Sequence, residues 1–265
     1  MERLALFGAA LMLAAPAAAM AASPFDGTWK TDPKTITTSG KPMVDVLKDG
    51  YLACSSCVPA YRVKADGAPQ PMPADEPYIN RLTVTVVDAH TIRAAGSQGT
   101  KQMGVQTWTV SPDGKALTIK FDMAPIHPGA PPAEATTVYT RVAAGPAGSH
   151  AASGTWRRTA VTALSDSNAT MTLKVDGPTV VYTSAAGTSY HAVSGGKPVP
   201  MRGDPTGLMA SVEKVGDHKV VETDWRKGKK VEVDTYTVAP DGKTMSVVEH
   251  FLDTGRVTTS TANKI

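Results

Sequence analysis

The chain has 265 residues, and its 27 basic and 24 acidic residues give a formal net charge of +3. These charges are interspersed along the sequence, apart from one basic cluster from Arg226 to Lys230. Proteins that bind nucleic acid usually concentrate basic residues on one face, where they neutralise phosphates. We therefore expect no nucleic-acid partner.

The first 21 residues have the pattern of a secretory signal peptide. Arg3 precedes an apolar run from Leu4 to Ala15, and small residues follow up to Ala21. The apolar run is shorter than the roughly 20 residues that a membrane-spanning helix needs, and no later stretch approaches that length. We predict a signal peptide over 1–21, cleavage near Ala21, no transmembrane segment, and a periplasmic or secreted protein.

The remainder of the chain contains an internal repeat. Three segments recur in the same order, 127 to 129 residues further along the chain. Three matches in one order at one spacing indicate a duplication. The matched segments are Gly27-Thr28-Trp29 with Gly154-Thr155-Trp156, Tyr61–Met72 with Tyr190–Met201, and Thr107–Ile119 with Thr235–Val247. A stretch of small residues separates the copies, so we predict one repeat over 22–143, a linker over 144–153 and a second repeat over 154–265.

Within each copy, apolar and polar residues alternate. The pattern is clear over 82–86, 117–123 and 171–175, and it is typical of strands with one buried face. Asp-Gly pairs, which suit tight hairpin turns, separate such runs. We count about eight strands per copy, a number that allows a small barrel to close. The sequence predicts an all-β protein of two tandem antiparallel up-and-down barrels or half-barrels, and leaves open whether the copies form one joint sheet.

The two cysteines of the chain are Cys54 and Cys57. In an oxidising compartment they are expected to pair with each other, because no other cysteine is present. Redox activity is an alternative, although the flanking residues predict strands rather than the helix N-terminus that lowers a thiol pKa. A metal is a further alternative, but a structural zinc site needs four ligands. The second copy has Thr183–Ala186 at this place and no cysteine, so we expect the bridge to be dispensable for folding.

The other residues that could take part in catalysis or metal binding are interpreted as structural. His90 and His218 occupy equivalent places after a turn in the two copies, which favours a role in a hairpin. His127 lies in a proline-rich segment, and His150 lies in the predicted linker, where we expect it to be solvated. Neither the Gly-x-Ser-x-Gly motif nor the His-Glu-x-x-His motif occurs. We expect a protein without catalytic residues, metal or cofactor.

The Gly27-Thr28-Trp29 strand, followed at the end of the copy by Arg141, resembles the pattern of the lipocalin and fatty-acid-binding superfamily. In that superfamily a Gly-x-Trp strand closes one end of the barrel, and a late basic residue packs across the Trp ring. The resemblance implies that Arg141 covers Trp29. For the second copy it implies the same structural role for Gly154, Trp156 and Lys264.

The whole mature chain also resembles a group of exported tandem-repeat β proteins of Gram-negative bacteria. The similarity lies in the Gly-x-Trp opening and in Cys54–Pro59, Lys64–Gly67 and Ser111–Lys115. This resemblance implies export but no particular activity.

Three functions are compatible with these features. The first is a non-enzymatic binding protein for a small hydrophobic or lipid-like ligand in the cell envelope, because small barrels either fill their interior or hold one ligand. The second is a structural or interaction protein without a small ligand. The third is a thiol–disulfide redox protein that uses Cys54 and Cys57.

Overall fold

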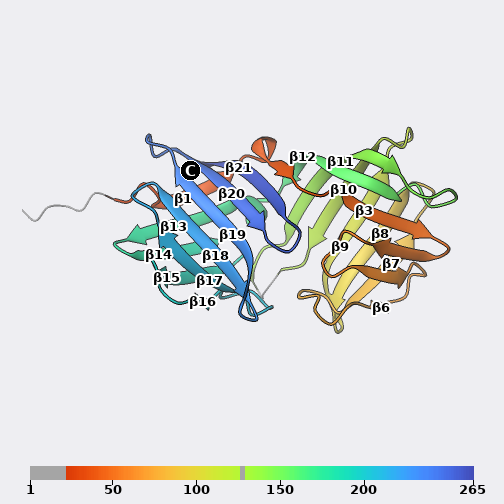
Figure 1. Ribbon diagram of the computed structural model, residues 1–265, viewed down its shortest axis with the longest axis horizontal. Coiled ribbons are helices and arrows are strands. Elements are labelled where there is room, and N and C mark those ends of the chain that lie inside the picture. The colour runs from red at the N-terminus through yellow and green to blue at the C-terminus, as the bar shows by residue number, and fades with distance from the viewer. Residues whose placement is uncertain (1–21, 126–128) are drawn as a thin grey trace, which may run out of the picture.

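The computed structural model describes residues 22–125 and 129–265 and consists almost entirely of strands. The strands form two antiparallel, nearly closed, barrel-like sheets that lie side by side (Figure 1). This confirms the expectation of an all-β protein with two barrels. The predicted signal peptide and His127 lie outside the described residues.

The first barrel is a sheet of ten strands in the order β5-β4-β3-β12-β11-β10-β9-β8-β7-β6. Nearly all neighbours in this order are consecutive along the chain, as in a meander. Its strands are β3 (Met43–Lys48), β4 (Tyr51–Cys54), β5 (Tyr61–Lys64), β6 (Gln70–Pro71), β7 (Arg81–Val86), β8 (Thr91–Gln98), β9 (Lys101–Val110), β10 (Ala116–Met123), β11 (Ala133–Ala144) and β12 (Gly154–Leu164).

The second barrel is a sheet of eleven strands in the order β15-β14-β13-β1-β21-β20-β19-β18-β17-β16, with β2 also paired to β21. Both sheets therefore have more strands than the eight expected, because short strands such as β2, β6 and β16 join them. The strands are β1 (Gly27–Thr31), β2 (Thr37–Ser39), β13 (Thr170–Asp176), β14 (Thr179–Ser184), β15 (Ser189–Val193), β16 (Val199–Pro200), β17 (Met209–Lys214), β18 (Lys219–Arg226), β19 (Lys229–Val238), β20 (Thr244–Phe251) and β21 (Arg256–Lys264).

The opening strands of the two repeats are exchanged between the barrels. β1 pairs with β13 and β21 and so completes the second barrel, whereas β12 pairs with β3 and β11 and completes the first. In Figure 1 the red strand β1 accordingly lies among the teal and blue strands. The barrels therefore do not coincide with the ranges 22–143 and 154–265 that the repeat suggests.

The segment predicted as a linker connects two paired strands. Ala144 at the end of β11 pairs with Gly154 at the start of β12, so the residues between them form the loop of a hairpin. This loop is packed against the first barrel: the His150 amide donates to the Leu47 carbonyl, and Ser153 Oγ accepts from the Leu47 amide at 2.8 Å. The hairpin is the local reason why β12 joins the first barrel, since consecutive strands usually pair.

The exchange also changes which basic residue covers which Trp ring. Trp29 and Trp156 are both fully buried. The Arg141 guanidinium lies 4.0 Å from the centre of the Trp156 ring, and Lys264 Nζ lies 4.8 Å from the centre of the Trp29 ring. The pairing expected within each copy is thus replaced by a pairing between copies. The physical reason is that Arg141 lies directly opposite Trp156 on the paired strand.

The glycine before each Trp is required by its surroundings. Gly154 has a φ of +148°, and an added Cβ would lie 2.6 Å from both the Ala143 carbonyl oxygen and Nη1 of Arg141. Gly27 has a φ of +138° beside the Lys264 side chain. Side chains other than glycine rarely adopt such φ angles. The Gly-x-Trp pattern is therefore part of the closure of each barrel.

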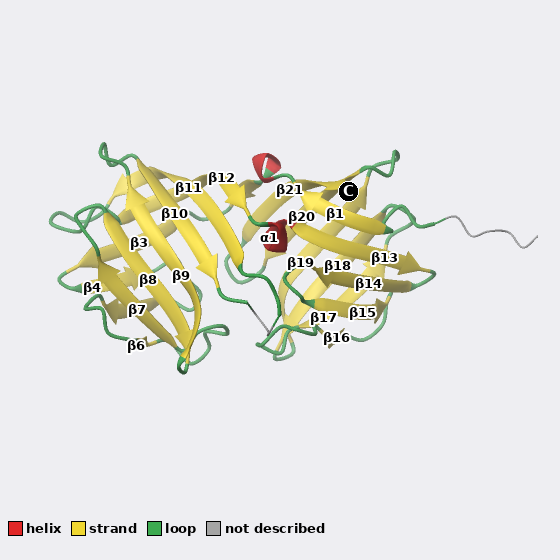
Figure 2. Cartoon of the chain, turned by 180° about the vertical axis from the view of Figure 1, so that it is seen from behind, coloured by secondary structure: helices red, strands yellow, loops and turns green. Residues whose placement is uncertain are grey.

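Polar contacts join the barrels where the chain crosses between them. Arg158 on β12 donates to Thr38 and, at 3.2 Å, to the hydroxyl of Thr258 on β21. On another side of the junction, Arg226 of the second barrel donates to the Tyr78 hydroxyl of the first at 3.1 Å. The short helix α1 (Asp166–Ala169) lies between the barrels (Figure 2). None of the helices in the described residues has the length and apolar character needed to cross a membrane.

Candidate functional site

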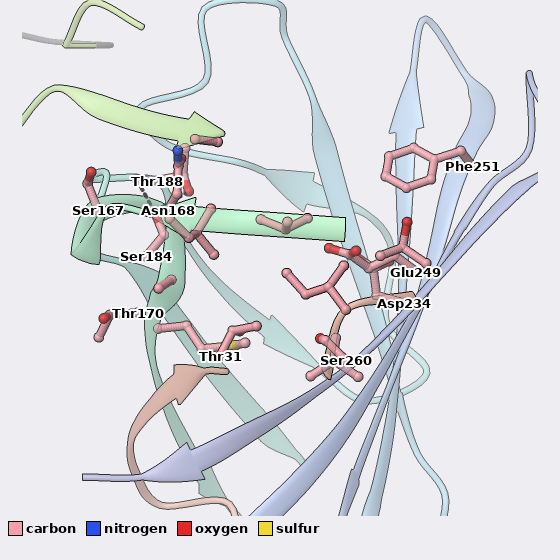
Figure 3. A pocket seen from close by; sticks show the side chains of 18 of the residues that line it. Thr31, Ser167, Asn168, Thr170, Ser184, Thr188, Asp234, Glu249, Phe251 and Ser260 are labelled. Carbon is pink, nitrogen blue, oxygen red and sulfur yellow. Dashed lines mark hydrogen bonds between the residues drawn. The ribbon is translucent and has the colours of Figure 1, made fainter. Parts of the chain in front are cut away.

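A cavity of about 610 Å³ opens in the second barrel, beside α1 and the edge of the first barrel. Figure 3 shows its two walls: Asp234, Glu249 and Phe251 lie on one side, and Ser184 and Thr188 lie opposite. The size is within the range of cavities that hold small organic ligands. Apolar side chains, hydroxyls and carboxylates all contribute to the lining.

Carboxylates form two neighbouring rows across strands β18, β19 and β20. In the first row, Glu222 lies directly opposite Asp234, which lies directly opposite Glu249. In the second row, Asp224 lies directly opposite Glu232. Directly opposite residues on paired strands have Cβ atoms about 4.5–5.5 Å apart, and like charges at such positions repel each other. Opposite acids in both rows are therefore unfavourable when they are ionised.

These carboxylates are buried and have few partners. Glu222 accepts hydrogen bonds from the hydroxyls of Tyr190 at 2.8 Å and Tyr236 at 3.2 Å. Asp224 and Asp234 each have one buried oxygen without a hydrogen-bond partner. Within the described part of the chain, no basic side chain forms an ion pair with any of them. A buried charge without a partner is costly, so the site favours whatever neutralises it.

Burial shifts the acid–base equilibria of the cavity. It raises the pKa of Asp224 to about 6 and that of Glu232 to about 8, with added repulsion from neighbouring carboxylates. Burial and neighbouring carboxylates also raise the pKa of Glu222 and of Asp234 well above their usual values. The pKa of Glu249 is raised by burial, although Arg256 and Arg158 partly oppose this shift. The cluster therefore holds protons that a bound cation would displace.

The cavity suits an organic cation better than a metal ion. Tyr182, Tyr236 and Phe251 contribute aromatic rings to the lining. The Arg256 guanidinium already lies 3.9 Å from the centre of the Phe251 ring, so the two tyrosine rings are the ones that can attract a bound cation in addition to the carboxylates. Over residues 22–125 and 129–265, no three His, Cys, Asp or Glu side chains are placed to hold a metal. Met201, Leu208 and the other apolar lining residues provide a surface for the uncharged part of a ligand.

The first barrel has no comparable rows of acids. The row equivalent to Glu222, Asp234 and Glu249 there consists of Ala94, Gln106 and Phe121. The Trp108 indole donates to Gln106 at 2.9 Å, and this level of the barrel is occupied by side chains. In the second row, a Cβ added to Gly96 would lie 2.8 Å from the Ile79 side chain, so Ile79 fills the space. The acidic cavity is specific to the second barrel.

The cysteines predicted from the sequence lie in the first barrel, away from this cavity. Cys54 and Cys57 form a disulfide between the end of β4 and the following loop. Cys57 lines a separate pocket of about 420 Å³ at the junction of the barrels. Of the predicted structural residues, Gly154, Trp156 and Arg141 lie in the first barrel, and Gly27, Trp29 and Lys264 lie in the second.

Three of the described histidines, His90, His150 and His218, form hydrogen bonds that involve the backbone. His218 lies 3.1 Å from the Val238 carbonyl oxygen, and the His90 amide donates to the Asp88 carboxylate at 2.7 Å. His150, expected to be solvated, instead has its ring 2.7 Å from the Asp88 carbonyl and accepts from the Ala152 amide at 3.1 Å. It is half-buried because the loop that carries it packs on the first barrel.

Sequence reasoning missed the acidic cavity, although a signal was present. On β18, Glu222 and Asp224 lie two and four residues after the core residue Val220. Because side chains alternate between the two faces of a strand, these acids point to the same interior side as Val220. Their equivalents in the first copy are Ala94 and Gly96. A search for acids at inward positions in one copy alone would have found the cluster.

Comparison with known proteins adds no assignment to this site. The chain matches no protein-family model, no curated protein and no solved structure. The chemistry of the site therefore rests on its own carboxylates, aromatic rings and hydroxyls.

Proposed function

We propose that this chain is an exported, non-enzymatic binding protein whose second barrel holds a small organic amine with an apolar body. The observation that carries the proposal is the pair of carboxylate rows, Glu222–Asp234–Glu249 and Asp224–Glu232: in the described residues no basic side chain forms an ion pair with them, and Asp224 and Asp234 each have one buried oxygen without a hydrogen bond. The signal-peptide pattern of the first 21 residues supports export. The apolar body of the amine agrees with the hydrophobic ligand expected for a small barrel. The carboxylates of the cavity add the requirement that this ligand carries a positive charge.

An ammonium group supplies what the cavity lacks. It is a compact cation that donates up to three hydrogen bonds, which matches acceptor oxygens from several strands. Charge-assisted bonds of this kind are stronger than neutral ones, and they relieve the repulsion between opposite acids. A neutral or anionic lipid would leave the carboxylates uncompensated. Arg158 and Arg256 also line the cavity: both oppose the rise in the pKa of Glu249, and Arg256 opposes that of Glu232, but within the described residues neither forms an ion pair with an acid of the two rows.

The proposal is tested with a fluorescent alkylamine, dansylcadaverine, titrated into the full chain. We expect the N-acetylated probe, which has lost its charge, to bind about tenfold more weakly or worse, since 1.4 kcal/mol corresponds to a factor of ten. Binding should release protons, because the amine favours the ionised carboxylates. Calorimetry in buffers of different ionisation enthalpy measures that release.

Variants locate the binding in the cavity. Glu222→Gln and Asp234→Asn should each weaken dansylcadaverine binding, whereas Glu213→Gln, which removes an exposed acid from the same barrel, should not. Equal affinity for the charged and acetylated probes, or a preference for dodecanoate over the amine, would refute the amine proposal in favour of a lipid-like ligand. Binding of none of these probes, together with no ligand in native mass spectrometry of the exported protein, would favour a structural protein.

A further inference from the structure

The disulfide of the first barrel lies beside a buried acid. Asp45 on β3 is directly opposite Cys54 on β4, and Cys54 is directly opposite Tyr61 on β5. The same row of the second barrel consists of Leu173, Tyr182 and Tyr190, so the strand register places Tyr182 at the position of Cys54, one residue before the Thr183 that the sequence alignment indicates. The fold therefore accepts a leucine at the position of Asp45, and its closure does not require an acid there.

Asp45 has no structural partner. Its residue is 1% exposed, and both carboxylate oxygens are buried without a hydrogen bond. Burial alone raises its pKa to about 7. Tyr61, whose pKa Asp45 raises in turn, is the titratable group that faces it from β5. On the other side of Asp45, the residue directly opposite it on β12 is Gly154, which has no side chain. The nearby Arg141 guanidinium stacks on Trp156 and donates to backbone carbonyls.

The two sulfurs differ in access. Cys54 is 1% exposed and faces the interior with Asp45, whereas Cys57 is half-buried. The junction pocket that Cys57 lines, of about 420 Å³, is rich in cations and hydroxyls and contains one acid, Asp253. Its cations are Lys41, Arg157, Arg158 and Arg256. An incoming anion is attracted to this pocket, and a Cys57 thiolate is stabilised there.

We propose that Cys54–Cys57 is a redox-active pair that exchanges with a small thiol bearing an anionic group, with Asp45 as the proton donor to Cys54. The thiolate of the small molecule attacks Sγ of Cys57 from the junction pocket. A bond forms between these two sulfurs as the Cys54–Cys57 bond breaks, and the electron pair remains on Cys54. The Asp45 carboxyl, directly opposite Cys54, gives its proton to Cys54, which avoids a buried thiolate, and the resulting carboxylate then takes a proton from water; the Ser56 hydroxyl lies 3.6 Å from Sγ of Cys54.

A second small thiolate then completes the reduction. It attacks the small-molecule sulfur of the mixed disulfide, which releases a small-molecule disulfide and leaves Cys57 as a thiolate. Two thiols have been oxidised and the protein pair has gained two electrons. Arg158 and Arg256 line both the junction pocket and the amine cavity, whereas Lys41, Arg157, Asp45 and both cysteines lie outside the amine cavity, so variants at these positions test the exchange separately.

The first test compares reducing thiols of different charge on the full chain. Reduction by 2-mercaptoethanesulfonate, 2-mercaptoethanol and cysteamine is followed by alkylation and mass spectrometry, with rates expressed per thiolate. We expect the anionic thiol to react about tenfold faster than the cationic one, as electrostatic attraction at a site of one sign predicts. The variant Lys41→Glu/Arg157→Glu should abolish that preference. The matched variant Lys197→Glu/Lys219→Glu, on exposed positions of the second barrel, should retain it.

The second test is the pH profile of the exchange. In the native chain the rate per attacking thiolate should fall as the pH rises through about 7, because Asp45 loses its proton there. Asp45→Asn and Asp45→Leu should react about tenfold more slowly at pH 6 and show no such inflection. Tryptophan fluorescence checks that the barrel is intact. The same rate for all three thiols, an inflection that persists in both variants, or reduction only upon unfolding would overturn the proposal.

Discussion

The two barrels share a scaffold but differ at the level of their interiors. Both are closed by a buried Trp under a basic side chain, Arg141 over Trp156 and Lys264 over Trp29. Above that closure, the second barrel has rows of acids around a cavity, whereas the first has small and aromatic residues that fill it. Features present in both copies therefore maintain the fold. The features found in one copy only, namely the acidic rows and the pairing of Asp45 with the disulfide, are the ones that could bind a ligand or react.

The largest expected effect tests the exchange of strands. Trp156→Ala should destabilise the protein by about 3–5 kcal/mol, the cost of a cavity left by a buried Trp. Because β12 belongs to the first barrel, amide hydrogen exchange should rise first in β3–β11. Trp29→Ala should have the reverse effect and increase exchange in β13–β21. Increased exchange in the barrel of the same repeat instead would contradict the exchanged pairing.

Asp45→Leu introduces into the first barrel the residue that the second barrel has at that position. Because burial raises the folded-state pKa of Asp45 from 3.8 to about 7, its contribution to stability is present below pH 4 and lost as the pH rises through 7. The variant should therefore gain about 4 kcal/mol at pH 8 relative to the native chain, and much less at pH 4. Urea unfolding at the two pH values measures the gain. Leu173→Asp is the reciprocal variant and should lose stability at pH 8.

The variant Asp224→Asn tests the effect of the acidic rows of the second barrel on the pH dependence of stability. The folded-state pKa of Asp224 is raised to about 6, so its ionisation destabilises the native barrel progressively between about pH 4 and pH 6. The variant should be more stable than the native chain by about 3 kcal/mol at pH 8. Urea unfolding monitored by Trp fluorescence tests this. A native chain whose stability increases from pH 5 to pH 8 would show that the acids are not buried as described.

The smallest effect concerns the disulfide. Cys57→Ser should leave the fold intact and cost about 2 kcal/mol, because the bridge closes a very short loop. The second barrel, which folds without a bridge at the equivalent place, should be unaffected. A thermal melt that shows complete loss of folded protein would contradict this expectation. An increase in amide hydrogen exchange that is confined to β3–β5 in the variant would support it.

Much of the local structure could be predicted from the sequence. Leu117 and Ile119 are buried on one face of β10, as their alternation with polar residues indicated. The Cys54–Cys57 disulfide followed from the absence of other cysteines. The candidate cavity was not predicted, because the acids of its two rows lie on three strands and become neighbours only through the register of β18, β19 and β20.

The duplication, the β-strand class and the Gly-x-Trp strand at the start of each copy can all be read from the sequence. These features depend on short-range patterns, namely side-chain alternation, turn residues and repeated motifs. Which barrel each closing strand joins depends on the tertiary structure. The two Gly-Thr-Trp segments are identical in sequence, and the β11–β12 hairpin places Trp156 in the first barrel, while Trp29 lies in the second. Tertiary structure likewise decided where charge is buried, since burial depends on strand register and on what fills the space opposite.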